Sequence, residues 1–202
     1  NYKPYEKMLK TIDRSIRKSN HKFEFIDLGG GMGISYEKNN KKLNFKIYNS
    51  LINKFLKKNN SKIIFEPGRS IIGDAAILIT KVIYIKKNKN KNFIILDAAM
   101  NDLIRPALYG AKHQIIPSIK SKKTSNKIFE FVGPICESTD KFLITNKFQS
   151  IKEGDFVIIC DVGAYGMSLA SNYNVRPLPA EILVKNSKVQ VIKNRQKLSD
   201  LI

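Results

Sequence analysis

The sequence has few cysteines and no long apolar run, and each shortage excludes a class of protein. Two cysteines, Cys136 and Cys160, are too few for a disulfide framework, so we expect a reducing, cytoplasmic setting. No stretch of about 18 apolar residues occurs, so we expect no membrane partner. The residue pattern also predicts no metal site.

Acidic residues are scarce as well, with 17 against 36 lysines and arginines, which gives a formal net charge of +19. Such an excess raises the question of nucleic-acid binding. The charge lies in lysine- and asparagine-rich stretches spread along the chain, at 37–42, 57–62, 86–91 and 120–127. Arginine is scarce, and aromatic residues do not alternate with the basic runs as a stacking platform requires. We therefore expect no specific nucleic-acid partner, only weak, salt-sensitive adhesion to polyanions.

The first 70 residues alternate between helical and strand patterns. Apolar residues at helical spacing predict an amphipathic helix over residues 4–19, and the period returns between Tyr48 and Leu56. Residues 23–28 and 63–65 read as strands, the second of them buried. This order of helix, strand, helix, strand predicts βα units with a parallel sheet.

After Ile71 the pattern changes to apolar, β-branched runs separated by polar turns. Strands are expected within 75–85, 92–100, 127–133, 155–163, 180–184 and 188–192, with a hairpin turn at 185–187. A short helix within 101–110 is the one interruption. We therefore assign residues 1–72 to an α/β domain and residues 73–202 to a mostly antiparallel β domain.

Two motifs follow the strands of the first domain. "DLGGGMG" places Gly31 among four glycines directly after a strand, where backbone N–H groups can approach a phosphate. "EPGR" ends the next strand in Glu66, Pro67, Gly68 and Arg69. The alternatives are a tight turn and a solvated surface ion pair. Because the carboxyl ends of neighbouring parallel strands meet, the two motifs together favour a ligand site.

Three further segments carry chemistry in the second domain. "DAAMNDLIRPALYGA" follows a strand and is dense in polar groups, which suggests ligand contact or else a capped short helix; these groups are Asp97, Asn101, Asp102, Arg105 and Tyr109. "VGPICESTD" sets Cys136 beside Glu137, where a thiol can donate a proton, although a lone cysteine is more often a small core residue. "GAYGMSLASNYNVRPLPAE" presents Tyr165 between glycines, where a plain surface tyrosine is the alternative.

These five segments, in this order, resemble the diaminopimelate decarboxylases, which belong to the fold-type III pyridoxal-phosphate decarboxylases. The resemblance implies the last βα units of a (β/α)8 barrel followed by a C-terminal β-sandwich or β-barrel domain. It also implies decarboxylation of meso-2,6-diaminopimelate to L-lysine and carbon dioxide. The alternatives are a related decarboxylase acting on ornithine, arginine or carboxynorspermidine, and a non-catalytic regulatory relative. Within the group, Cys136-Glu137-Ser138 favours diaminopimelate over ornithine.

The resemblance also implies roles for individual residues. The cofactor pyridoxal 5'-phosphate would be held by Gly31, Glu66, Pro67, Gly68, Arg69 and Tyr165. Glu66 would pair with its pyridine nitrogen. The far end of the substrate would be bound by Arg69, Arg105, Tyr109, Glu137 and Tyr165. Cys136 would return a proton to the α-carbon. Because the Cys-Glu loop of this family reaches into a neighbouring subunit, a homodimer is implied.

Two family features have no counterpart in these residues. The family's Schiff-base lysine lies on an early barrel strand, and a histidine from a middle strand stacks on the cofactor; neither His21 nor His113 matches that position. A complete barrel takes about 250 residues. We therefore expect this chain to be the C-terminal part of a longer protein and to be inactive by itself.

Overall fold

The computed structural model describes residues 2–36, 43–89 and 91–201. The basic run at 37–42 therefore lies outside the described residues. The chain divides into two compact units, Asn1–Gly73 and Asp74–Ile202, and each is described by itself. Among the helices of the described ranges, none combines the length and the apolar character needed to cross a bilayer.

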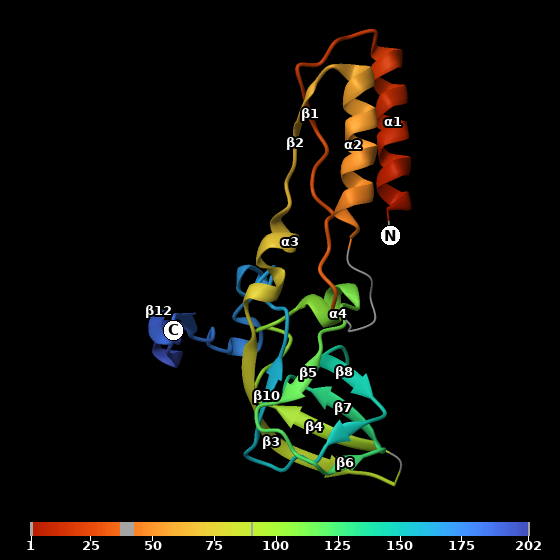
Figure 1. The fold of residues 1–202 in the computed structure, drawn as a ribbon. Coiled ribbons are helices and arrows are strands. Elements are labelled where there is room, and N and C mark those ends of the chain that lie inside the picture. The colour runs from red at the N-terminus through yellow and green to blue at the C-terminus, as the bar shows by residue number, and fades with distance from the viewer. Residues whose placement is uncertain (1, 37–42, 90, 202) are drawn as a thin grey trace. The chain divides into compact units, whose positions relative to one another are not determined.

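The first unit packs two helices against two short strands. Helices α1 (Lys3–Ser19) and α2 (Phe45–Asn59) lie side by side (Figure 1), and strands β1 (Phe25–Asp27) and β2 (Lys62–Ile64) run parallel. Both helices end at an asparagine in the left-handed conformation, Asn20 and Asn60, a backbone conformation that ends many helices and is more often adopted by glycine. The predicted order of helices and strands is confirmed. The hydrophobic core of this first unit contains Leu9, Ile26, Leu28, Met32, Tyr48, Ile52 and Phe55.

The second strand is less buried than the sequence pattern predicts. Ile64 is 44% exposed and Phe65 is 38% exposed, so the interpretation of residues 63–65 as a buried strand is wrong for these two side chains. Alternate side chains of a strand point to opposite faces, and the helices of this unit pack against Ile26 and Ile63, so Ile64 points to the uncovered face; Phe65 lies beyond the end of β2. A sheet of two strands cannot cover its own second face.

The second unit is built around a six-stranded sheet that curls over its own core (Figure 1). The strands follow the spatial order β5–β10–β3–β4–β7–β8. Their bounds are β3 Leu78–Lys87, β4 Lys91–Leu96, β5 Ile115–Pro117, β7 Ile128–Val132, β8 Lys141–Thr145 and β10 Phe156–Ile159. The pairing is antiparallel except between β4 and β7, which confirms the mostly antiparallel prediction. The strands β5 and β8 were not predicted, because their apolar runs are short.

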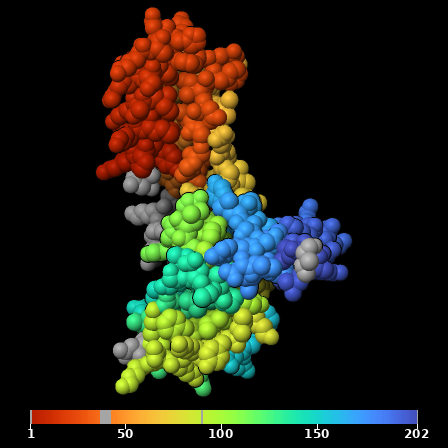
Figure 2. All heavy atoms as spheres, turned by 180° about the vertical axis from the view of Figure 1, so that it is seen from behind, coloured from red at the N-terminus to blue at the C-terminus, as the bar shows by residue number. Residues whose placement is uncertain are grey.

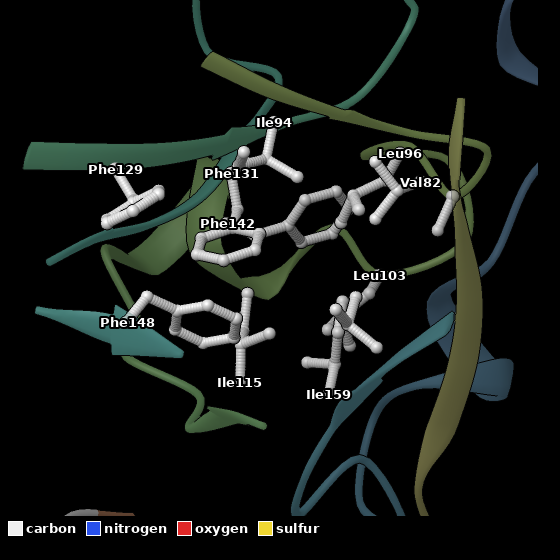
Figure 3. Packing of buried hydrophobic residues seen from close by; sticks show 12 residues of the cluster. Val82, Ile94, Leu96, Leu103, Ile115, Phe129, Phe131, Phe142, Phe148 and Ile159 are labelled. Carbon is white, nitrogen blue, oxygen red and sulfur yellow. The ribbon is translucent and has the colours of Figure 1, made fainter. Parts of the chain in front are cut away.

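The concave side of this sheet holds the main hydrophobic core. In Figure 3 the rings of Phe131, Phe142 and Phe148 point inward toward Ile115 and Ile159. The Phe131 and Phe148 rings meet edge to face with centroids 4.8 Å apart. These side chains come from β5, β7, β8, β9 (Phe148–Gln149) and β10, so the core fixes the strand ends that precede the Cys136 and Tyr165 loops.

Shorter elements complete the unit. The predicted helix within 101–110 is confirmed as α4 (Arg105–Tyr109), whereas α3 (Gly68–Ile72) in the first unit was not predicted, since Pro67-Gly68 resembles a turn. Strands β6 (Thr124–Ser125) and β9 (Phe148–Gln149) pair with each other. Within the ranges that the structure describes, 3-10 turns cover Gly73–Ala75, Met167–Leu169, Tyr173–Val175 and Leu198–Leu201.

After the six-stranded sheet the chain forms a two-stranded hairpin, β11 (Glu181–Lys185) and β12 (Lys188–Lys193). The turn residues Asn186 and Ser187 both have positive φ, as a two-residue turn of the primed type requires, so the predicted hairpin is confirmed. Nearly all of its side chains are exposed. In Figure 2 its blue spheres project from the rest of the second unit.

Candidate active site

In the first unit the two strand-end motifs lie next to each other, as predicted. Parallel pairing sets Asp27 opposite Ile64, and the pairing continues past both strands. The Leu28 N–H donates to the Ile64 carbonyl at 3.0 Å, and the Glu66 N–H donates to the Gly29 carbonyl at 2.9 Å. The glycine loop therefore begins against the backbone of Glu66.

The glycines of this loop are required by its geometry. A Cβ atom at Gly30 would lie 2.3 Å from the Glu66 carbonyl oxygen, so no larger residue fits. Gly29 and Gly31 have φ values of 64° and 76°, in the left-handed region that favours glycine. The Tyr5 hydroxyl donates to the Gly31 carbonyl at 2.9 Å, which ties the loop to α1. The result is a cradle formed by the backbone of three consecutive glycines, Gly29–Gly31, at the ends of two parallel strands.

The charged residues of the "EPGR" motif border this cradle. Glu66 is exposed, and Arg69 follows in the first turn of α3. The Arg69 Nη2 atom lies 3.7 Å from the position that a Cβ atom would occupy at Gly33. Of the predicted site residues of this unit, the structure thus brings Glu66 and Arg69 close to the glycine loop that holds Gly31.

In the second unit, several polar groups after β4 stabilise the fold internally. The Asp97 carboxylate accepts hydrogen bonds from the Thr80 hydroxyl and the Lys81 N–H. The Asp102 carboxylate accepts from the Ala99 N–H at 2.8 Å. Burial raises the pKa of Asp102, although the Ala99 N–H and the Arg176 guanidinium oppose that rise. These two carboxylates thus bind other parts of the fold, and the alternative of a capped short helix does not describe them either, because α4 has no side-chain cap.

Arg176, which sequence reasoning did not single out, ties the loop that carries Tyr165 to this segment. Its Nε donates to the Asn101 side-chain oxygen at 2.9 Å, and its Nη2 donates to the Asp97 carbonyl. The buried Asn101 amide also donates to the Ser171 carbonyl at 3.2 Å. Arg176 lies in the segment "NVRP", but its side chain binds residues more than 70 positions earlier in the chain, and local sequence patterns do not predict such contacts.

Two of the predicted substrate-binding residues meet in this unit. The Arg105 guanidinium carbon lies 5.8 Å from the centroid of the Tyr165 ring, within cation–π range. Arg105 is buried, whereas Tyr165 is half exposed and holds a positive φ of 62°. Tyr109 lies one helical turn after Arg105 on α4, with its ring exposed. The Arg105 guanidinium and the Tyr109 phenol thus lie in the segment that follows β4, and the Tyr165 phenol lies in the segment that follows β10.

The loop of Cys136 and Glu137 joins β7 to β8 and is held from its base by Asp140. The buried Asp140 carboxylate accepts from the Met100 N–H at 2.8 Å and from the Ile135 N–H at 2.9 Å. Burial raises the pKa of Asp140, against the opposing effect of those two N–H groups. Cys136 and Glu137 are both exposed at the tip. The alternative of a core cysteine is therefore wrong for Cys136, and its thiol is open to a ligand.

Comparison with known proteins agrees with this fold. Residues 11–163 match the family model described as "Pyridoxal-dependent decarboxylase, C-terminal sheet domain". The diaminopimelate decarboxylase of Aquifex aeolicus is 39% identical over 186 residues, which cover 92% of this chain and 44% of that protein.

Solved structures give the same result. Diaminopimelate decarboxylase from M. jannaschii superposes with a TM-score of 0.89 at 33% identity, covering 100% of this chain and 48% of that one. The Helicobacter pylori enzyme complexed with L-lysine gives 0.83 at 42% identity, covering 97% and 48%. The chain thus spans about half the length of the relatives it matches. With a family model matched over most of its length, this chain belongs to the pyridoxal-dependent decarboxylases and carries their C-terminal sheet domain.

Proposed function

We propose that the protein containing these residues is a diaminopimelate decarboxylase, which converts meso-2,6-diaminopimelate to L-lysine and carbon dioxide. The observation that carries the proposal is the identity of 39% to a relative of that name over 92% of the chain. In this proposal residues 1–72 belong to the (β/α)8 barrel and residues 73–202 to the β domain.

The residues of the first unit fit pyridoxal phosphate. A phosphate needs several convergent N–H donors and close backbone approach, and the Gly29–Gly31 cradle leaves that space because a Cβ at Gly29 or Gly31 would meet no atom within 4 Å. We assign the phosphate to Gly31 and to the Gly68-Arg69 backbone. When bound, the cofactor accepts the electron pair that is released as carbon dioxide leaves.

Glu66 has a separate task in this proposal. Glu66 is exposed and lies two residues after the end of β2, where the glycine cradle lies. A carboxylate beside the pyridine nitrogen favours the protonated, cationic ring, because opposite charges stabilise each other at short range. Glu66 would therefore hold a proton at that nitrogen and increase the ring's capacity to accept electrons.

The far end of the substrate carries a carboxylate and an ammonium group, and the chain offers a partner for each. Arg69, Arg105 and the Tyr109 hydroxyl are donors suited to the carboxylate. The Glu137 carboxylate suits the ammonium group. Tyr165, whose ring lies beside the Arg105 guanidinium, would contact both cofactor and substrate. A substrate without the distal carboxylate would leave an arginine without its partner, which disfavours its binding.

Cys136 is assigned the proton transfer. Once the bond between the α-carbon and the departing carboxylate breaks, that carbon needs a proton to give lysine. The Cys136 thiol stands exposed at the loop tip next to Glu137. The thiol would deliver its proton to the α-carbon and regain one from water.

The decisive experiment measures lysine formation from meso-diaminopimelate by the natural polypeptide that contains these residues, with pyridoxal phosphate added. We expect kcat/KM for diaminopimelate to exceed that for ornithine, arginine or carboxynorspermidine by at least about 100-fold. The Cys136→Ala variant should lose about 100- to 10,000-fold in kcat. The half-buried Cys160 offers the matched control, since Cys160→Ala should leave kcat nearly unchanged. Turnover of another substrate in preference to diaminopimelate would refute the proposal.

We further propose that the protein forms a homodimer. The support is the C-terminal hairpin, whose apolar side chains remain exposed, among them Val184 and Val189, which are cross-strand partners. Apolar surface of this kind is typical of partner interfaces. Val184→Lys combined with Val189→Lys should shift the molar mass measured by light scattering from dimer to monomer. An unchanged molar mass would show that the hairpin is not part of the dimer interface.

A cytoplasmic location is proposed on the basis of the thiols. Both cysteines are free, and an exposed catalytic thiol at Cys136 needs a reducing environment to stay reduced and reactive. Cell fractionation with an antibody against the protein tests this directly, and recovery from an oxidising compartment would contradict it.

A further inference from the structure

His113 is a buried histidine whose two ring nitrogens each lie within hydrogen-bond distance of a group of the second unit. It lies between α4 and β5 and is 1% exposed. Its Nδ1 atom lies 2.8 Å from the Cys160 carbonyl oxygen. Its Nε2 atom lies 3.0 Å from Nη1 of Arg105. The imidazole thus connects the end of β10 to a predicted substrate-binding arginine.

The chemistry of these two partners fixes the state of the ring. A carbonyl oxygen can only accept a hydrogen bond, so Nδ1 must carry the proton. A guanidinium can only donate, so Nε2 must be the acceptor. Both conditions hold together only in the neutral imidazole with its proton on Nδ1. Burial lowers the pKa of His113 and the Arg105 charge lowers it further, while the Cys160 carbonyl and Asp161 act in the opposite direction.

The connection is anchored to the sheet. The Cys160 N–H donates to the Gln114 carbonyl at 2.9 Å, directly beyond the paired ends of β5 and β10. His113 and Cys160 are therefore held by the same ladder that orders the core. The loop leaving this point carries Tyr165, whose ring also lies against the Arg105 guanidinium.

We propose that His113 is a positioning residue, which orients the Arg105 guanidinium toward the distal carboxylate of the substrate. The inference rests on the proposed decarboxylase function and adds a residue to it. A neutral imidazole directs Nη1 through a hydrogen bond without placing a negative charge beside the guanidinium. A carboxylate in the same place would fix the arginine but would compete with the substrate carboxylate for its charge.

The test compares His113→Leu, which removes both contacts, with His113→Gln, whose amide keeps a donor and an acceptor on neighbouring atoms. Both are made in the natural polypeptide. His113→Leu should raise KM for diaminopimelate about 10- to 100-fold with little change in kcat, as expected for loss of a hydrogen bond to a charged group. His113→Gln should restore most of the affinity. The exposed His21 supplies the control, because His21→Leu should change neither constant.

A pair of inhibitors separates positioning from a general structural role. L-Lysine retains the distal carboxylate of the substrate, whereas cadaverine has the same carbon chain and amines without any carboxylate. His113→Leu should weaken inhibition by L-lysine about 10- to 100-fold and leave inhibition by cadaverine unchanged. Equal weakening of both inhibitors would overturn the proposal, as would unchanged KM and lysine inhibition. If the wild-type protein forms no lysine from diaminopimelate, the proposed function itself fails.

The ring state can be measured without any turnover. Nitrogen-15 NMR of the wild-type protein should show a neutral histidine with its proton on Nδ1, and that signal should disappear in His113→Gln. This measurement holds even if His113→Leu does not fold. A proton on Nε2, or a charged ring at neutral pH, would overturn the assignment.

Discussion

Gly133→Ala should destabilise the second unit by displacing the Asp140 carboxylate. A Cβ atom at Gly133 would lie 2.2 Å from Oδ2 and 2.4 Å from Oδ1 of Asp140, far inside contact distance. The carboxylate cannot simply rotate away, because it accepts the N–H groups of Met100 and Ile135. The backbones of the two residues are also held together, since the Gly133 N–H donates to the Asp140 carbonyl at 3.0 Å.

The magnitude follows from the bonds at risk. A hydrogen bond to a charged group contributes about 1.5–3 kcal/mol, so losing one or both costs about 1.5–6 kcal/mol. Replacing glycine by alanine also restricts the unfolded chain, which stabilises by about 0.4–1 kcal/mol. Gly133 is not among the glycines with positive φ, so no backbone strain is added. The lost hydrogen bonds outweigh the entropy term, and we expect a net loss of about 1–5 kcal/mol.

Urea unfolding followed by circular dichroism measures this loss, with tyrosine fluorescence as a second probe because the chain lacks tryptophan. The decisive comparison repeats Gly133→Ala in an Asp140→Ala background, where the clash is gone and the change should be neutral or slightly stabilising. Gly154→Ala is the control: its φ of 87° carries a strain of about 1–2 kcal/mol with or without Asp140. An equal cost of Gly133→Ala in both backgrounds would refute the reasoning.

Three further predictions concern the core, the pH response and the glycine cradle. Phe131→Ala removes a fully buried ring and should lower the free energy of unfolding by about 3–5 kcal/mol, as measured by the same urea titration. Because burial holds the pKa of His113 below its ordinary value of 6.5, the unfolded chain takes up that proton first, so this group makes stability fall as the pH drops below 6.5. The His113→Gln variant should lose that part of the slope, and an identical pH profile would contradict it. Gly30→Ala forces the loop off the Glu66 carbonyl and should raise the Kd of pyridoxal phosphate by about 10-fold or more, equivalent to 1.4 kcal/mol, as followed by cofactor absorbance.

Local patterns in the sequence were sufficient to predict the main helices, several strands and the loops at the strand ends. Helical spacing predicted α1 and α2, and glycines after two apolar runs predicted two loops at adjacent strand ends. The Asn186-Ser187 turn predicted the hairpin. These features depend on residues close together in the chain, because propensity, periodicity and turn chemistry act over a few positions.

Tertiary structure decided which polar residues face a ligand and which hold the fold. Asp97 and Asp102 appeared as suitable for ligand contact as Arg105, yet their acceptors are satisfied by Thr80, Lys81 and Ala99. His113 and Asp140 had no distinguishing signal, and their roles come from partners up to 47 positions away. A buried polar group is defined by its hydrogen-bond partner, and only folding of the loops onto the curled sheet chooses that partner.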